Sequence, residues 1–232
     1  MSFTRPGYRV GKLFLAEGPD GVGKSTVVAH ITAHLRSRNI PVISARLPGG
    51  TAVGEAVRAF FKQNAAHLPI EDQIAMNLLA MRQLVQEVIR PALEAGTYVV
   101  CDRFTDSLYA YQWAGFSEFD PAVKQRIDDN ILLYGVDIPA DLKIVLDCPV
   151  QTSLERMHQG RADEHDILDQ MNRHFKSRVR SYYQDHLKES AYGHTCYVNT
   201  VEGQANTLAI VERLVNVLCF DNVHQHDTAS VT

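Results

Sequence analysis

The sequence predicts an α/β fold of three layers, in which a central parallel sheet of about five strands carries helices on both faces. Short apolar runs alternate along the chain with longer segments of helical periodicity, a pattern typical of a parallel sheet covered on both sides. The 232 residues are 45% hydrophobic and 22% charged. This ordinary globular balance provides enough apolar residues to bury a substantial core.

The predicted elements follow one another in a regular order. Strands are expected at the short apolar runs 12–16, 41–45, 98–101, 142–146 and 197–199. Helices are expected over 24–38, 71–94, 150–158, 168–188 and 204–218, where apolar residues recur at helical spacing. Val28, Ile31 and Leu35 show this spacing in the first helix, and Gly96 is the expected stop of the second.

Both ends of the chain lack this periodicity. Residues 1–10 and 221–232 are therefore expected to be a loose N-terminus and a loose C-terminal tail. Between them we find no Gly/Ser linker, repeat or low-complexity stretch, so residues 11–220 are predicted to form a single domain.

Charge and cysteine content limit the classes of function. Lys plus Arg number 23 and Asp plus Glu 27, so the net charge of −4 argues against binding along a nucleic-acid backbone. The four cysteines lack metal-binding or redox spacing, which indicates buried thiols in a reducing compartment. The N-terminal apolar run is too short for a signal peptide, and no run of about 18 apolar residues predicts a membrane span. We expect a cytoplasmic protein.

A glycine-rich motif follows the first predicted strand and opens the first predicted helix. It fits G-x-x-x-x-G-K-[ST] with Gly18, Pro19, Asp20, Gly21, Val22, Gly23, Lys24, Ser25 and Thr26. The glycines let backbone N–H groups turn towards phosphate oxygens, and the helix N-terminus faces the same anion. A lysine then reaches the β- and γ-phosphates, while a serine hydroxyl suits Mg²⁺. The strand and helix around the motif disfavour a chance glycine turn and predict a P-loop NTPase fold that binds a nucleoside triphosphate.

The loop alone leaves GTPase, motor ATPase and small-molecule kinase open. The Asn-Lys-x-Asp guanine signature of GTPases does not occur in the chain. Two strands end in an aspartate, and Asp147 is followed by Cys148 and Pro149, which turn the chain away. Asp102 is followed by Arg103, a pair that favours a substrate-facing role over a simple helix cap.

Further basic residues stand where a phosphate acceptor could bind. Arg46 follows the second strand, and Arg82 lies in an apolar stretch of the long helix, where a salt-bridged surface role is the alternative. Late in the chain, acidic residues are interleaved with Arg156, Arg161, Arg173, Arg178 and Arg180. This pattern fits either a solvated helical hairpin or a helical lid at about 156–170 that closes an arginine over the transferred phosphoryl group.

Four stretches resemble the thymidylate kinase family, P-loop enzymes that phosphorylate dTMP with ATP. They are residues 17–26 (EGPDGVGKST), 46–51 (RLPGGT), 102–112 (DRFTDSLYAYQ) and 175–183 (FKSRVRSYY). The third is the most specific, and the resemblance extends from about Leu13 to Leu218.

The resemblance implies a set of roles. The loop, with Lys24 and Ser25, binds ATP and Mg²⁺, and Asp102 is the second candidate metal ligand. On the acceptor, Asp20 contacts the sugar 3′-hydroxyl, and Arg46 and Arg103 contact the phosphate. Arg82 contacts the edge of the base. The nucleoside pocket is lined by Ser107, Tyr111 and Gln112. Because the loop contains no arginine, the catalytic arginine is expected from the lid, with Arg161 preferred and Arg156 second. The family also implies a homodimer. The apolar helix 71–94 fits an interface, although a core role is the default for it.

Three positions depart from the family pattern. Leu47 replaces a glutamate, Leu78 stands at the position expected to stack on thymine, and Ile167 stands where the lid has an arginine. All three lie on the acceptor side or in the lid, so a nucleotide kinase is better supported than one for dTMP in particular. A modified deoxyuridylate, a deoxynucleoside acceptor, or a P-loop nucleotide-binding protein with weakened catalysis remain alternatives.

Overall fold

The computed structural model describes residues 10–136, 138–160, 171–186 and 194–220. Its centre is a sheet of five parallel strands in the order β2-β3-β1-β4-β5, which confirms the predicted fold class. The strands are β1 (Leu13–Glu17), β2 (Val42–Arg46), β3 (Tyr98–Asp102), β4 (Leu142–Asp147) and β5 (His194–Asn199).

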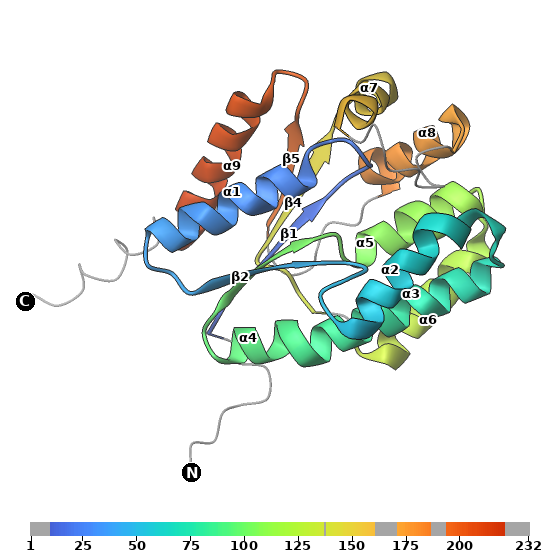
Figure 1. Cartoon of the computed structure of the whole chain (residues 1–232), viewed down its shortest axis with the longest axis horizontal. Coiled ribbons are helices and arrows are strands. Elements are labelled where there is room, and N and C mark those ends of the chain that lie inside the picture. Colours follow the sequence, from blue (N-terminus) through green and yellow to red (C-terminus); the bar gives the residue numbers. More distant parts are fainter. Residues whose placement is uncertain (1–9, 137, 161–170, 187–193, 221–232) are drawn as a thin grey trace, which may run out of the picture.

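Helices cover both faces of the sheet (Figure 1). On one face lie α1 (Lys24–Ser37) and α9 (Gln204–Cys219), and on the other lie α3 (Ile70–Leu84), the π-helical turn η2 (Val85–Ile89) and α4 (Arg90–Glu94). Successive residues of β1 alternate between these layers because side chains of a strand point to opposite faces. Leu13 and Leu15 pack with the α3 layer, whereas Phe14 and Ala16 pack with the α1 layer.

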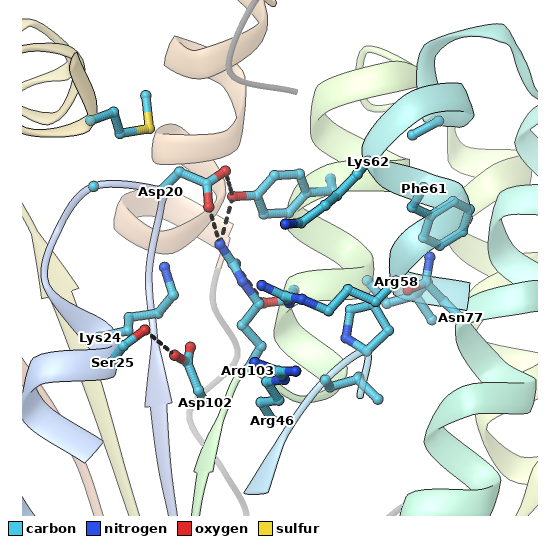
Figure 2. Close-up of a pocket in the computed structure, with 18 of the residues that line it drawn as sticks. Asp20, Lys24, Ser25, Arg46, Arg58, Phe61, Lys62, Asn77, Asp102 and Arg103 are labelled. Carbon is cyan, nitrogen blue, oxygen red and sulfur yellow. Dashed lines mark hydrogen bonds and ion pairs between the residues drawn. The ribbon is translucent and has the colours of Figure 1, made fainter. Parts of the chain in front are cut away.

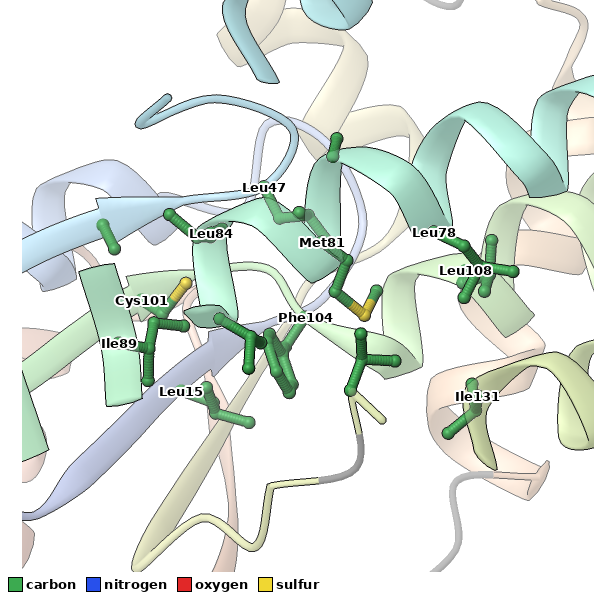
Figure 3. Packing of buried hydrophobic residues seen from close by; sticks show 14 of the residues in the cluster. Leu15, Leu47, Leu78, Met81, Leu84, Ile89, Cys101, Phe104, Leu108 and Ile131 are labelled. Carbon is green, nitrogen blue, oxygen red and sulfur yellow. The ribbon is translucent and has the colours of Figure 1, made fainter. Parts of the chain in front are cut away.

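The core beneath α3 is built from long aliphatic side chains (Figure 3). Leu78, Met81 and Leu84 of α3 are completely buried there, above Phe104 and the Cys101 thiol at the end of β3. Each such side chain contributes roughly 1.5–3 kcal/mol through burial. This packing fixes the rotation of α3 about its axis and therefore decides which of its residues can face a ligand.

Most predicted helices are present with small shifts at their ends. The predicted helix 71–94 corresponds to the unbroken run of α3, η2 and α4, and α7 (Val150–Gly160) extends the predicted 150–158 by two residues. The predicted helix 168–188 includes α8 (Arg173–Ser181) and the π-helical turn η4 (Tyr182–His186), while 168–170 and 187–188 lie outside the described residues.

Helical segments that the sequence reading missed flank the carboxyl ends of β2 and β3. They are α2 (Ala52–Asn64), the 3₁₀ turn η1 (Ala65–His67), α5 (Thr105–Leu108), the π-helical turn η3 (Tyr109–Phe116) and α6 (Pro121–Tyr134). Two carried visible start signals. Thr51 caps α2 by accepting from Gly54 N at 3.0 Å, and Asp120 caps α6 by accepting from Ala122 N at 2.8 Å, ahead of Pro121.

Several expectations concern residues beyond the described ones, including most of both predicted loose termini and lid residues 161–170. The division into one domain and two termini stays a prediction. Within the described part of the chain, no helix is long and apolar enough to cross a membrane. All four cysteines are free. Cys101 and Cys148 are buried, as the sequence indicated, whereas Cys196 and Cys219 are only partly buried.

A buried ion pair joins the sheet to the segment after β3. Lys143 Nζ on β4 lies 2.5 Å from Asp106 Oδ2 on α5, and both side chains are less than a tenth exposed. Tyr182 in η4 donates its hydroxyl to the other oxygen of Asp106 at 3.0 Å. Opposite charges and a hydrogen bond offset the large cost of removing these groups from water, so the pair determines where α5 sits.

We expect Lys143→Met to lower the free energy of unfolding by about 3–5 kcal/mol, because it leaves the carboxylate of Asp106 buried without a counter-charge. Urea unfolding followed by circular dichroism measures this change. The double variant Lys143→Met with Asp106→Asn removes the buried charge and retains an acceptor for Tyr182, so it should regain at least half of the loss. Equal destabilisation in the single and double variants would contradict the ion-pair account.

Candidate active site

The candidate site is a cleft of about 400 Å³ at the carboxyl ends of the parallel strands (Figure 2). The chain passes from β1 across β3 to β2, and later from β3 across β1 to β4, so the connections from these two neighbouring strands run in opposite directions across the sheet. Ligands of open α/β sheets bind outside such a switch point. The cleft is lined by the loop after β1, the ends of β2 and β3, and the facing sides of α2, α3 and η3.

The loop between β1 and α1 has the backbone shape of a phosphate-binding loop. Gly18, Gly21 and Gly23 have φ angles of 133°, 75° and 98°, in the region that favours glycine. A Cβ atom on Gly18 would lie 2.2 Å from Leu146 O, so no larger residue fits there. The first turn of α1 has no side-chain cap, which leaves its N-terminal N–H groups to an anionic ligand.

Lys24 is folded back onto this loop. Its Nζ donates to Gly18 O at 2.9 Å and to Pro19 O at 2.5 Å, and the side chain is buried. Burial and the positive charge of Arg103 lower the pKa of Lys24 to about 8, against the attraction of nearby carboxylates. An incoming phosphate would replace the two carbonyl acceptors and raise this pKa again.

Arg103 organises the wall opposite Lys24. Its guanidinium forms an ion pair with Asp20 and donates to Ser107 Oγ and Tyr111 Oη, both at 3.1 Å. Tyr111 in turn donates to Asp20 at 2.5 Å. Burial alone would raise the pKa of Asp20, but the charges of Arg103 and Lys24 outweigh it and hold that pKa well below its usual range. Asp20 is therefore an ionised acceptor that fixes Arg103 over the cleft (Figure 2).

A buried carboxylate that the sequence reading missed lies directly behind this wall. Glu17 is completely buried at the end of β1 and accepts from Phe104 N at 2.6 Å, Ser107 Oγ at 2.9 Å and Tyr183 Oη at 3.0 Å. Burial and the nearby charge of Asp106 raise the pKa of Glu17. The bonds from Phe104 and Ser107 fix the segment that follows Arg103. Arg103 itself has a φ of 71°, which is strained for a non-glycine residue.

Two oxygen donors converge beside the loop. Ser25 Oγ donates to Asp102 Oδ2 at 2.8 Å, so the hydroxyl after the loop lysine and the carboxylate at the end of β3 lie together. Among the described residues, no cluster of three or more His, Cys, Asp or Glu could hold a metal by itself. Mg²⁺ commonly takes one or two protein oxygens and completes its shell with phosphates and water, so this pair fits it chemically.

Arg46 is held at the rim of the cleft. Its Nη2 donates to both carboxylate oxygens of Glu55 on α2, at 2.9 and 2.8 Å, and Glu55 also accepts from Gly50 N at 2.9 Å. The hydrogen bonds from Gly50 and Arg46 lower the pKa of Glu55. Leu47, which replaces the glutamate of the family pattern, is buried in the core and also lines the cleft.

The structure places two of the predicted site residues of α3 away from the cleft. Leu78 is completely buried in the core and does not line the cleft, and Arg82 is exposed, with one long 3.4 Å bond to Tyr134 O. The residue of α3 that lines the cleft is Asn77. An α-helix turns by about 100° per residue, so Arg82 lies about 140° around the axis from Asn77. A reading of sequence spacing that is wrong by one position therefore selects the wrong face of α3.

The remaining predicted residues divide into two groups. Ser107, Tyr111 and Gln112 line the cleft. Arg156 also lines it and is anchored to Thr200 by bonds of 2.8 Å to Oγ1 and 2.7 Å to the backbone oxygen. Arg161 and Ile167 lie outside the described residues.

Cleft residues that the sequence reading missed come mainly from α2 and the faces opposite the loop. They are Arg58, Phe61, Lys62, Asn77 and Phe116. Arg58, Phe61 and Lys62 lie on α2. The N-cap residue Thr51 was visible in the sequence and could have predicted this helix.

A glycine-rich phosphate loop facing an arginine-lined acceptor wall defines a P-loop nucleoside monophosphate kinase, a transferase. Comparison with known proteins narrows the class, since the thymidylate kinase family model matches residues 16–206. The chain belongs to the thymidylate kinase family. It is 42% identical to a thymidylate kinase of Methylococcus capsulatus over 75% of this chain and 80% of that protein. It is 34% identical to one of Latilactobacillus sakei over 93% and 98% of the two chains.

A solved structure supports the same fold. The crystal structure of thymidylate kinase from Ehrlichia chaffeensis superposes with a TM-score of 0.65 and covers 90% of this chain and 98% of that one. Its sequence identity is 24%, so this likeness concerns the fold alone.

We expect ATP binding to take up roughly half a proton or more at pH 8.5, because phosphate charge restores the proton that Lys24 has partly lost there. Calorimetry of Mg²⁺–ATP binding in two buffers of different ionisation enthalpy measures this uptake. Lys24→Met should show none at the same pH, and wild type should show much less at pH 7, where Lys24 is already charged. Equal heats in both buffers at pH 8.5 would rule out the lowered pKa.

Proposed function

We propose that this protein transfers the γ-phosphoryl group of ATP to the phosphate of dTMP, yielding dTDP and ADP. The observation that carries the proposal is the arrangement of cations around one cleft. Lys24 lies on the donor side, while Arg103 and Arg46 lie on the acceptor side. Two anionic phosphates that must react face to face need their charges neutralised from both sides.

The reaction needs no covalent intermediate with the protein. An oxygen of the acceptor phosphate attacks the γ-phosphorus in line, and the bond to the bridging oxygen of ADP breaks. The chain contributes positioning and charge. Lys24 exchanges the carbonyls of Gly18 and Pro19 for phosphate oxygens, and the planar fork of Arg103 binds the acceptor phosphate bidentately. Asp20, held by Arg103 and Tyr111, presents a carboxylate to the sugar 3′-hydroxyl.

Mg²⁺ is the cofactor that we propose for this reaction. Ser25 and Asp102 would hold it, and when bound it neutralises charge on the donor phosphates. The lid arginines complete the charge balance in this proposal. Arg156 already faces the cleft, and Arg161 follows it on the lid segment. A closed lid also excludes water, which would otherwise compete with the acceptor.

The site argues against a deoxynucleoside as acceptor. A sugar hydroxyl needs a general base, and the carboxylate of the cleft nearest that role is Asp20. Its pKa is held far below neutrality, because the charges of Arg103 and Lys24 outweigh its burial. A carboxylate of such low pKa is a weak base at physiological pH. Arg103, by contrast, is well placed to bind a phosphate.

Lys24→Ala should lower kcat for dTMP by at least about 100-fold, because it removes a preorganised charge from the developing transition state. A coupled assay of ADP release, run against a panel of nucleoside monophosphates and nucleosides, measures this loss and the acceptor preference of the wild type. Ser37→Ala, at the exposed far end of the same helix, should leave kcat unchanged. Near-wild-type turnover of Lys24→Ala, or preference for a nucleoside, would contradict the proposed reaction.

We also propose that two copies of the chain pair through α3 and α6 and that the protein works in the cytoplasm. Leu79, Leu132 and Leu133 are 45%, 73% and 75% exposed on these helices. Glu71 contacts Arg126 and Arg82 contacts Tyr134, so α3 and α6 run in the same direction and place the three leucines at a similar level. Such an apolar patch is costly in water and typical of a protein interface.

Leu132→Glu together with Leu133→Glu should convert the proposed dimer to a monomer, because the interface would bury carboxylates without partners. Sedimentation velocity at micromolar concentration measures the mass of the species. Val217→Glu places the same charge on an exposed apolar position of α9 and should leave the dimer intact. A monomeric wild type, or a dimeric double variant, would refute the interface.

A further inference from the structure

Two neutral amides line the cleft away from the phosphate loop, and Arg58 and Lys62 of α2 line it as well. Asn77 of α3 and Gln112 of η3 both line it, beside the apolar side chains of Leu108 and Phe116. In Figure 2, Asn77 lies on the opposite side of Arg103 from Lys24. Arg82, the expected reader of the base edge, is not among the lining residues. A base that enters this part of the cleft therefore meets carboxamides.

A third amide, Gln73, lies one helical turn before Asn77 and is only 2% exposed. Its Nε2 donates to Ala65 O at 2.9 Å and to Leu68 O at 3.1 Å, which uses both hydrogens of the amide. Backbone carbonyls can only accept, so the Gln73 amide cannot be turned around without losing two bonds. Its orientation is fixed by the connection between α2 and α3.

The fixed amide of Gln73 orients its neighbours. Its Oε1 accepts from Gln112 Nε2 at 3.2 Å, so the nitrogen of Gln112 faces Gln73 and its Oε1 points the other way. Gln112 is 7% exposed and lines the cleft, so its Oε1 is the acceptor that it offers to a ligand. Asn77 Nδ2 donates to the backbone oxygen of Gln73 at 2.9 Å, and this bond holds the side-chain amide of Asn77 against the backbone of Gln73.

We propose that Asn77, and not Arg82, is the residue of α3 that contacts the acceptor's base, and that Gln73 is a positioning residue that makes Gln112 selective for an imide. The inference rests on the proposed monophosphate acceptor. The N3 position of thymine or uracil carries a hydrogen that the oxygen of Gln112 can accept. The N3 position of cytosine is itself an acceptor and would face that oxygen without a hydrogen between them. A site built around such directional bonds rejects the wrong base strongly.

The test compares dTMP with dCMP, both as kcat/KM in the ADP-release assay and as Kd by calorimetry. Gln73→Leu removes the bonds that orient Gln112, so its amide can turn and donate to cytosine. The dTMP-over-dCMP preference should then fall at least tenfold, while the KM for ATP stays within about twofold. A merely structural role would instead weaken both acceptors equally and leave their ratio unchanged.

Two variants of α3 separate its faces. Asn77→Leu should raise the KM and Kd for dTMP at least tenfold without changing the KM for ATP, whereas Arg82→Ala should leave all of these within about twofold. An unchanged preference in Gln73→Leu, or a tenfold loss of dTMP affinity in Arg82→Ala, would overturn the proposal. Because Kd is measured directly, wild type that binds dTMP selectively without phosphorylating it refutes the proposed function and leaves the base-reading inference standing.

Discussion

The hydrogen bonds of the buried Glu17 carboxylate are the interaction on which the site depends. Glu17 is the last residue of β1, immediately before the phosphate loop, and Phe104, Ser107 and Tyr183 donate to it. A carboxylate removed from water is very costly unless its oxygens are satisfied. Three donors from two distant segments meet that need, and in doing so they hold the segment after β3 against the loop.

This constraint gives the cleft its preorganised charges. With the residues after Arg103 fixed, its guanidinium is directed at Asp20 on the loop, and Tyr111 closes the group. Lys24 is likewise occupied, by carbonyls of its own loop. Binding of nucleotides therefore exchanges internal partners for phosphate oxygens and does not require the chain to assemble cations that were apart. Little reorganisation is then left for the transition state, which is where preorganised charge contributes most.

Local signals predicted the strands and the phosphate loop, whereas features set by tertiary packing escaped the sequence reading. The loop was found because its glycines, Lys24 and Ser25 are adjacent in sequence. Glu17 was missed as a site residue because its partners lie up to 166 positions away. Leu78 and Arg82 were expected to face the acceptor but do not line the cleft, because the burial of Met81 and Leu84 fixes the rotation of α3. Sequence spacing alone does not reveal that rotation. The helices α2, α5 and α6 were overlooked although the caps of two of them were visible.

The two ends of the cleft offer a ligand two different kinds of interaction. Charged groups gather at the phosphate end, where attraction is strong but tolerant of angle, so they supply affinity and position without distinguishing bases. The opposite end includes apolar side chains and the amides of Asn77 and Gln112, whose hydrogen bonds are weaker and directional. An arginine at that end could only donate hydrogen bonds. Its positive charge would also attract the phosphate away from the cations at the phosphate end. Neutral amides with fixed orientation avoid this competition, because they attract a phosphate only weakly. A base edge whose donors and acceptors match theirs forms a full hydrogen bond with them.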